Sequence, residues 1–391
     1  MVRGGTTARA RFLGVAIALL FSLPVGAEAA STRILHSFNN IDGSVLDAGL
    51  TPDADGSFVG VTSQGASDGS LGNGFLFRIQ QSGRFKILHE FAGADGSSPQ
   101  GEVAINGKGA IYGTTRFSGT ADGGCGCGLV YKRGPKGDFS VVYRFKGGAD
   151  GGYPHSALLL DGSGALYGSA EGLSGITAAV VFKIAPDGTE TVLHTFTAAT
   201  GDHPDSSGVV MDAAGALYGT TSRGGDFGDG VVYKISPKGK YTVLHHFAGG
   251  PGDGDGPSDG VTLAQDGSLY GTTKFGGSSG GGVVFKINAK GRYSVVHAFE
   301  SSNGRFPIAR PFQGSDGALY GTTSQGGGSC DCGVAFKLTQ KGRYSVLHRF
   351  TANPDGREPA AGLAADAKGR LYGTTHFGGT SDRGTVFRVI P

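Results

Sequence analysis

Beyond its first thirty residues, the sequence has no stretch in which apolar residues recur with the 3.6-residue period of an amphipathic helix. It also has no later apolar run that approaches the length needed to cross a bilayer. Catalytic signatures are absent as well, since no nucleophile elbow, His-Glu-x-x-His or phosphate-binding loop ending in Lys-Ser/Thr is found. We therefore expect an all-β chain that has no membrane span in its mature form, with no motif that names a reaction, a metal or a cofactor.

Charge is scarce and balanced. Residues 1–29 contain three of the 34 basic and one of the 32 acidic residues, so the rest of the chain carries 31 of each. A net charge near zero without a basic run argues against nucleic acid as a partner. We expect a monomer.

The N-terminus reads as a secretory signal peptide. Arg3, Arg9 and Arg11 form a basic region, residues 12–23 form a short apolar core, and Ala27-Glu28-Ala29 offers small residues at a cleavage point. We predict a signal peptide over residues 1–29, cleaved near Ala29, and a mature protein that is secreted, periplasmic or extracellular. A retained N-terminal membrane anchor is the alternative.

Glycine, by contrast, is abundant, at 75 of 391 residues, and glycines recur at the same places along the chain, including two in each copy of a repeated phrase. The phrase Gly-Ala-Leu-Tyr-Gly-Thr-Thr at 215–221 has close copies along almost the whole chain. Its aromatic residue falls at 58, 112, 167, 218, 270, 320 and 372, a period of about fifty residues. Such a period predicts one long repeat domain rather than several separate ones.

Each repeat contains four short strands. In one unit these are predicted over residues 207–211, 216–222, 231–235 and 240–247, each rich in Val, Tyr, Phe or Thr and bounded by Gly, Pro or Asp. Four strands with this period are typical of a β-propeller blade.

The ring closure can also be predicted. A fourth-strand phrase of the type Val-Leu-His-x-Phe occurs seven times, but the first copy lies at residues 33–38 and the chain ends with a first, second and third strand at 362–390. Pairing the two termini would complete the last blade and leave no open sheet edge. Residues 30–391 are thus predicted to form a seven-bladed propeller, with blades near 47–92, 99–146, 154–197, 204–248, 257–300 and 307–351, and a last blade from 359–391 plus 32–38.

The phrases Gly-x-Leu-Tyr-Gly-Thr-Thr, Gly-Val-Val-Phe-Lys-Ile and Val-Leu-His-x-Phe resemble the GloVer-type tandem repeat of secreted bacterial proteins, and the resemblance covers essentially all of residues 32–391. It implies an extracellular location and a repeat fold. It implies no particular activity, and we expect this chain to lack the C-terminal anchoring tail of some members.

Two recurring polar features have mainly structural interpretations. The fourth strands carry His36, His89, His194, His245, His297 and His348, with Tyr143 in the remaining blade. Because ring symmetry separates them, we expect packing and hydrogen bonding between blades rather than metal binding. Asp/Asn-Gly pairs such as Asp95-Gly96 and Asp255-Gly256 follow these strands, and we expect each Asp to cap its own turn, with calcium binding as the alternative.

The four cysteines form two Cys-x-Cys pairs, Cys125/Cys127 and Cys330/Cys332, in the same glycine-rich loop of blades two and six. Because free thiols are uncommon outside the cytoplasm, a local disulfide within each pair is predicted. A bridge or a zinc site shared by both pairs would have to join non-adjacent blades, and is the less favoured alternative.

Function is expected where the repeats differ. Just after the second strand, near the expected mouth of the channel, the side chains vary and are Gln64, Arg116, Glu171, Arg223, Lys274, Gln325 and His376. Phe117, Phe275 and Phe377 follow three of them, and blade three departs from the repeat at Ser169-Ala170-Glu171. Cations, amides and aromatic rings together suit an acidic or sugar-like ligand. A solvated rim without function is the alternative.

Three functions are consistent with this pattern. The first is a non-catalytic binding or interaction module that presents one loop face to a glycan or an extracellular protein. The second is an extracellular polysaccharide lyase or hydrolase with its site at the channel mouth. The third is a structural protein of the cell envelope.

Overall fold

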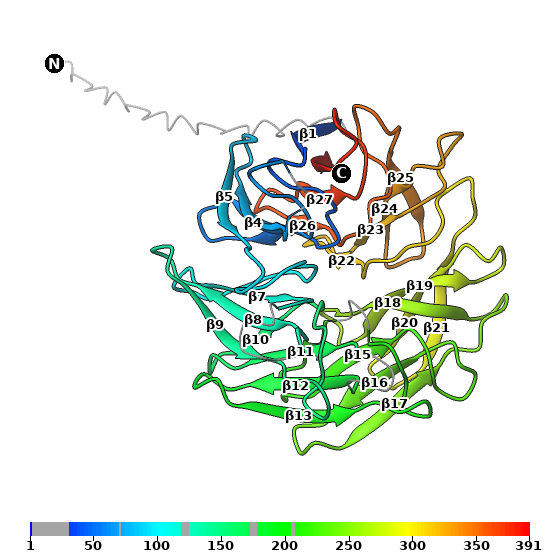
Figure 1. The fold of residues 1–391 in the computed structure, drawn as a ribbon. Coiled ribbons are helices and arrows are strands. Elements are labelled where there is room, and N and C mark those ends of the chain that lie inside the picture. The colour runs from blue at the N-terminus through cyan, green and yellow to red at the C-terminus, as the bar shows by residue number, and fades with distance from the viewer. Residues whose placement is uncertain (2–30, 70–71, 119–124, 173–177, 205–207) are drawn as a thin grey trace.

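A computed structural model of the chain describes residues 1, 31–69, 72–118, 125–172, 178–204 and 208–391. Apart from Met1, the predicted signal peptide lies outside this set. The described residues form 28 strands in seven four-stranded antiparallel sheets, arranged as blades around one axis (Figure 1). The predicted all-β, seven-bladed propeller is confirmed. No helix in the described part of the chain has the length and apolar character needed to cross a membrane.

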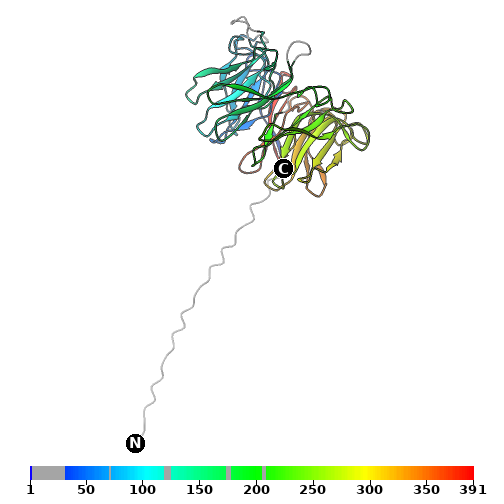
Figure 2. The same cartoon turned by 90° about the horizontal axis from the view of Figure 1, so that it is seen from below.

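The first six blades follow the chain from the axis outward. Their strands are β2–β5 (Thr51–Pro52, Phe58–Thr62, Phe75–Ile79, Phe85–Glu90), β6–β9 (Ala104–Ile105, Ile111–Thr115, Leu129–Arg133, Phe139–Arg144), β10–β13 (Leu159–Leu160, Leu166–Ala170, Val180–Ile184, Glu190–Thr195), β14–β17 (Val210–Met211, Leu217–Thr221, Val231–Ile235, Tyr241–His246), β18–β21 (Gly254–Leu263, Leu269–Gly276, Val283–Ile287, Tyr293–Ala298) and β22–β25 (Phe312–Gln313, Leu319–Thr323, Val334–Leu338, Tyr344–Arg349). In Figure 2 the early blades, blue to cyan, and the later blades, yellow to orange, lie on opposite sides of the ring.

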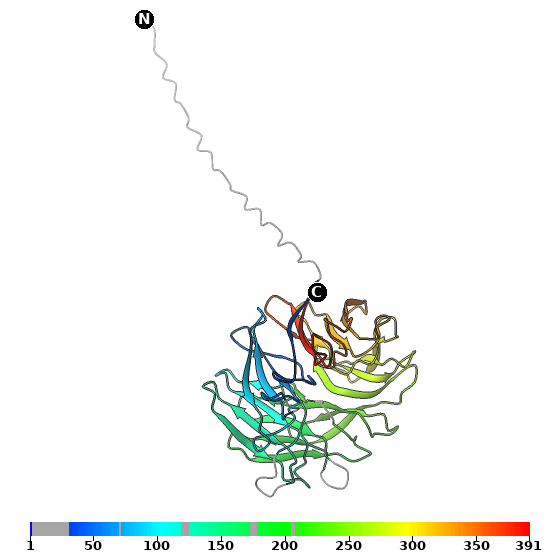
Figure 3. The same cartoon turned by 45° about the horizontal axis from the view of Figure 1, so that its top comes forward.

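The seventh blade joins the two ends of the described propeller, as predicted. It contains β26 (Ala364–Ala365), β27 (Leu371–Thr375) and β28 (Thr385–Ile390), with β1 (Ser31–Ser37) as its outer strand. Strands β1 and β28 run antiparallel from the pair Ser31–Ile390 to the pair Ser37–Thr385. Figure 3 shows the dark blue and red segments side by side. This pairing leaves no blade of the ring with a missing strand.

The repeated phrase has a packing explanation. Its second glycine lies opposite an aromatic residue of the third strand in every blade, for example Gly271 opposite Phe285. A Cβ atom on Gly271 would lie 2.4 Å from the end of the Phe285 ring, so no larger residue fits. The next threonine links neighbouring blades, since the Thr272 hydroxyl donates to the Ala309 carbonyl at 2.9 Å.

The fourth-strand histidines pack between blades, which confirms their predicted role. His245 stacks on Tyr293 of the next blade with ring centroids 3.7 Å apart, and its Nε2 lies 3.1 Å from the Asp253 carboxylate. Equivalent stacks join His36 to Phe85, His89 to Phe139, His194 to Tyr241 and His297 to Tyr344.

The predicted turn-capping aspartates are also found, with one correction. Asp253 accepts a hydrogen bond from the Ala248 backbone at 3.0 Å. Asp253-Gly254 is therefore the equivalent of Asp95-Gly96 in blade two, and the prediction that Asp255 caps this turn was wrong. The physical reason is that Gly254, like Gly96 in its own blade, packs directly against the last threonine of a second strand. Within the described residues, no three His, Cys, Asp or Glu side chains are grouped so as to hold a metal ion.

Two faces of the ring differ in their connections. The loops between second and third strands and the connections between blades share one side, called the upper face here. They pair through isolated bridges, such as Ser97 with Phe117 and Arg305 with Gln325. The tight hairpin turns form the lower face, where the Asp161, Asp212 and Asp366 carboxylates accept hydrogen bonds from the backbone of their own turns.

Candidate functional site

The central channel has two unlike parts. Its lower part is a cavity of about 540 Å³, and all seven blades contribute to its lining apolar side chains that lie in the innermost strand or directly before it, such as Leu50, Val103, Leu159, Met211, Leu263, Phe312 and Leu363. Its upper mouth is a cavity of about 370 Å³, called the basin here. Polar residues that line the basin include Asp47, Gln100, Glu102, Arg116, His155, Asp259 and Lys274.

An ionic bridge across the axis separates the two parts. Arg310, which precedes β22, places its Nη2 2.8 Å from Glu102 Oε2, although Glu102 belongs to a blade on another part of the ring. Its Nη1 lies 3.3 Å from Asp259 Oδ1, and its backbone N–H donates to Asp259 Oδ2 at 3.0 Å. Glu102 borders both cavities, Asp259 borders the basin and Arg310 borders the lower channel. The bridge therefore forms the floor of the basin.

Small residues make room for this bridge. One residue of each innermost strand pairs with the tyrosine of the repeated phrase in the second strand, or with Val59 in blade one. Two residues before it, the seven blades carry Gly49, Glu102, Ala157, Gly208, Gly260, Arg310 and Gly362. A Cβ atom on Gly49 would lie only 2.2 Å from Glu102 Oε1. In these seven positions, only blades two and six carry a long side chain, and these two chains meet across the axis.

The floor carries two carboxylates for one guanidinium. Removal from water raises the pKa of Asp259 to about 6, Arg310 opposes this rise, and the negative charge of Glu102 adds to it. Glu102 in turn raises the pKa of Arg310, so the guanidinium stays charged. Side-chain exposure is low, at 14% for Asp259, 22% for Arg310 and 25% for Glu102. When fully ionised, the bridge therefore has an excess of negative charge.

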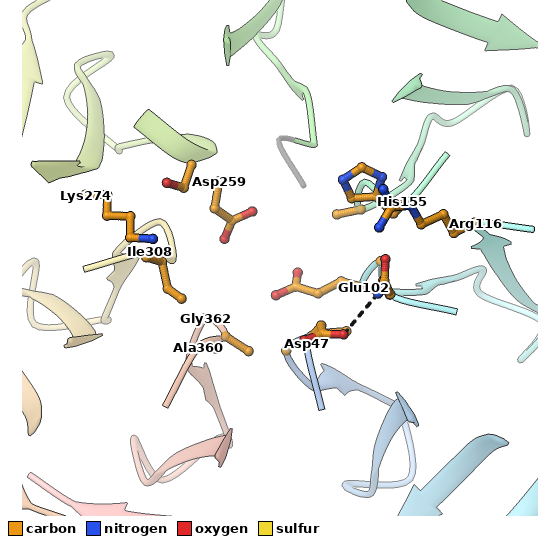
Figure 4. A pocket seen from close by; sticks show the side chains of 16 residues that line it. Asp47, Glu102, Arg116, His155, Asp259, Lys274, Ile308, Ala360 and Gly362 are labelled. Carbon is orange, nitrogen blue, oxygen red and sulfur yellow. Dashed lines mark hydrogen bonds between the residues drawn. The ribbon is translucent and has the colours of Figure 1, made fainter. Parts of the chain in front are cut away.

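Basic side chains stand on opposite sides of the basin (Figure 4). Arg116 and His155 lie on one side, and Arg116 Nη2 is 3.0 Å from Glu171 Oε2. Lys274 lies on the other side, next to Ile308. Within the part of the chain that the structure describes, the Lys274 ammonium has no hydrogen bond or ion pair, and its Nζ lies 5.3 Å from the centre of the Phe275 ring.

Asp47 adds acceptor oxygens at the wall of the basin. It accepts hydrogen bonds from Gln100 Nε2 at 3.2 Å, drawn in Figure 4, and from the Ser63 hydroxyl at 3.1 Å. Its other oxygen lies 3.8 Å from His376 Nε2. Asp47 is thus oriented by neighbours from three blades.

The residues predicted at the rim separate into two groups. Arg116, Glu171, Lys274 and His376 directly follow the last threonine position of the second strand, and they line the basin or contact a residue that does. Gln64, Arg223 and Gln325 lie one position later, pair with the neighbouring loop, and are not among the residues that line the basin. Successive residues of an extended chain point to opposite sides, which explains the division.

Sequence reasoning missed Asp47, Glu102, His155, Asp259 and Arg310. Asp47, Glu102, His155 and Arg310 lie shortly before the innermost strands of their blades, and Asp259 lies within β18, whereas the predicted rim residues all follow the second strands. One signal was available, because Glu102 and Arg310 stand where the other repeats have glycine or alanine.

The upper face also carries the exposed apolar side chains. Among the described residues beyond Met1, the large hydrophobic side chains that are exposed are Ile41, Phe117, Phe227 and Phe275, at 59%, 42%, 64% and 41%. Phe117, Phe227 and Phe275 lie in or beside loops between second and third strands, and Ile41 lies in a connection between blades. All four therefore belong to the same face as the basin.

The structure joins Cys125 to Cys127 and Cys330 to Cys332, each within one upper-face loop. The pattern Gly-x-Ser-x-Gly does occur, within strand β18 at 256–260 and in equivalent loops of blades one and five at 65–69, 276–280 and 277–281. A nucleophile elbow requires a helix directly after the serine, whereas Ser258 is followed by the rest of β18 and the loops are followed by the strands β4 and β20.

Several solved structures share the fold. The extracellular domains of two putative hybrid two-component systems from B. thetaiotaomicron match with TM-scores of 0.59 and 0.56 at 11% and 12% identity, over 91% and 92% of this chain but only 39% and 41% of theirs. PorZ, a bacterial surface component of the type-IX secretion system of Porphyromonas gingivalis, matches with a TM-score of 0.55 at 13% identity, over 90% of this chain and 47% of its own. The chain thus spans less than half the length of these relatives, and the likeness shows the fold alone.

A search of curated proteins finds no match. The model of the Gloeobacter/Verrucomicrobia repeat family matches residues 15–212 and 205–391, which together include all seven blades. With its repeated phrase, its seven blades and this match, the chain belongs to the Gloeobacter/Verrucomicrobia repeat family.

Proposed function

We propose that the protein is a secreted, non-catalytic binding module that presents its upper face to a glycan or to another extracellular protein. The observation that carries this proposal is the asymmetry of the ring. The basin and the four exposed large apolar side chains lie on the upper face, and exposed apolar groups beside a polar cavity are typical of a binding surface.

The expected location supports the same proposal. The sequence predicts a signal peptide over residues 1–29, and the similar propellers named above are extracellular domains or a surface component. The mature protein would then meet its partner outside the cytoplasm. A ligand held only at the loop face leaves the seven-bladed scaffold unchanged, which is how repeat scaffolds commonly carry function.

A polysaccharide lyase or hydrolase is the second candidate, because one observation favours it. Carboxylates with a strongly shifted pKa gather at catalytic sites, and Asp259 at the basin floor has such a shift. Arg310 holds this carboxylate through both its backbone and its side chain, and that arrangement also serves a structural floor.

The test is binding of residues 30–391 to a broad array of glycans and to extracellular proteins from a bacterial culture. A Phe117→Ala/Phe275→Ala variant should lose at least tenfold in affinity, because it removes two exposed aromatic rings from the upper face. Lys238→Ala, in an exposed turn of the lower face, is the matched control and should bind as the unchanged protein does.

Three results would separate the candidates. Binding without change to the ligand supports the module, and release of a shorter product supports the enzyme. A folded protein that binds nothing would overturn both and favour a structural role in the cell envelope.

A further inference from the structure

We infer that the basin binds one end of an acidic saccharide and that the ligand's carboxylate rests on Lys274. This inference rests on the proposed function and names the class of its ligand. It is carried by three features of the basin: its closed floor, its acceptor oxygens and the one lining cation that has no partner among the described residues.

The floor limits how a ligand can bind. The Glu102–Arg310 contact at 2.8 Å closes the channel beneath the basin, so a polysaccharide cannot pass through the ring. The volume of about 370 Å³ is at the small end of ligand cavities and accommodates one or two sugar rings. A chain must therefore enter from above, and only its terminal residues can reach the floor.

The acceptors suit hydroxyl groups. Asp47, Glu102 and Asp259 all border the basin. An ionised carboxylate has about four acceptor sites, and the hydrogen bonds from Gln100 and Arg310 use only some of them. Sugar hydroxyls donate to such oxygens without bringing a charge of their own. Hydrogen bonds to an ionised acceptor are also about twice as strong as neutral ones.

The cations select the ligand's charge. Arg116 is neutralised by Glu171, and Arg310 by two carboxylates, whereas Lys274 has no acidic partner in the described residues. The Nε–H group of Arg116 is also buried without a hydrogen-bond partner. A carboxylate on the ligand would supply the missing partner of Lys274, while a neutral sugar would leave this ammonium unpaired.

The exposed ring of Phe275 completes the arrangement. It lies beside Lys274 at the rim and is itself in edge contact with Phe306, with ring centroids 5.4 Å apart. An aromatic face next to an ammonium group can stack on the apolar face of a sugar whose carboxylate reaches the ammonium. A ligand with both groups on one terminal ring matches this spacing.

The experiment is calorimetric titration of residues 30–391 with saccharides that end in galacturonate, glucuronate or N-acetylneuraminate, and with their methyl esters. The esters keep the shape and remove only the charge. We expect the free acids to bind roughly tenfold or more tightly than the esters, because a charge-assisted hydrogen bond is lost. Lys274→Ala should abolish this preference, Lys274→Arg should retain it, and the control Lys238→Ala should leave it unchanged.

The outcomes distinguish this inference from the proposed function. Equal affinity for acids and esters, or an acid preference that survives Lys274→Ala, would overturn the acidic ligand while the binding module stands. Binding only of neutral glycans or of a protein partner would do the same. Failure of the folded protein to bind any glycan or protein would overturn both.

Discussion

The outer and inner rings of this propeller are built in opposite ways. In the outer ring the same contact recurs, and a fourth-strand histidine stacks on an aromatic residue of the next blade at five interfaces. In the inner ring the position that faces the axis holds glycine, alanine, glutamate or arginine, depending on the blade.

This difference shows how a repeat protein separates stability from specificity. The free-energy contributions of identical contacts between neighbouring blades add together, so one such contact can be removed without removing the others. A contact such as Glu102–Arg310 exists once and connects residues 208 positions apart. Substitutions in the outer ring should therefore change stability without changing the basin, whereas those in the inner ring should change both.

The largest effect is expected at the floor. Arg310→Met leaves Glu102 and Asp259 facing each other without a cation, and we expect the free energy of unfolding to fall by about 3 kcal/mol. Glu102→Gln should cost less, because Arg310 keeps Asp259. Guanidinium denaturation measures both, with Arg292→Met in an exposed turn as the control. An Arg310→Met loss no greater than that of the control would show that the bridge does not stabilise the ring.

The pH dependence of the free energy of unfolding should report the ionisation of Asp259 in the basin floor. The native pKa of Asp259, about 6, lies above the value of about 4 in an unfolded chain, so between these pH values the folded state keeps a proton that the unfolded state releases. Its contribution to the free energy of unfolding is therefore greatest below pH 4 and falls as the pH rises to 6.

Comparison with Asp259→Asn isolates this group from the other acids. Between pH 4 and pH 7 the unchanged protein should lose about 2 kcal/mol relative to the variant, as measured by denaturation at several pH values. A difference that is independent of pH, or that grows in favour of the unchanged protein, would contradict the raised pKa.

The outer ring offers a matched pair of smaller effects. His245 has both a hydrogen bond to Asp253 and a stack on Tyr293, whereas His348 keeps the bond to Asp355 but has no stacked ring in the next blade among the described residues. His245→Ala should lower the free energy of unfolding by about 2 kcal/mol, and the loss from His348→Ala should be smaller than this by about 1 kcal/mol. Equal losses would mean that the stack contributes nothing. Ligand binding should be unchanged in both variants.

The smallest effect concerns two buried hydroxyls. Tyr131 and Tyr233 occupy a third-strand position that is Phe in the other blades, and their hydroxyl groups are buried without a hydrogen-bond partner. Burial alone accounts for most of the raised pKa of each. Replacing either with Phe should raise the free energy of unfolding by up to about 1 kcal/mol. Tyr372→Phe is the contrast, because its hydroxyl donates to Asp366 at 3.0 Å and its loss should destabilise the ring.

Particular residues show how far prediction from the sequence extends. Arg116 and Lys274 could be singled out because they vary beside a repeated phrase. The same reasoning included Gln64, Arg223 and Gln325, which lie one residue further and pair with a loop instead. One position along an extended chain reverses the side on which a residue points, and the boundary of a strand cannot be read to that accuracy from its sequence.

The sequence by itself determined the number of blades, their order and the closure of the ring. These properties depend on local patterns that recur about every fifty residues, and each blade packs mainly on its neighbours. Only the tertiary structure decided what meets at the axis. Glu102, Asp259 and Arg310 come from different blades, and no local pattern relates them. They become neighbours because closing the ring brings the innermost segment of every blade to the axis.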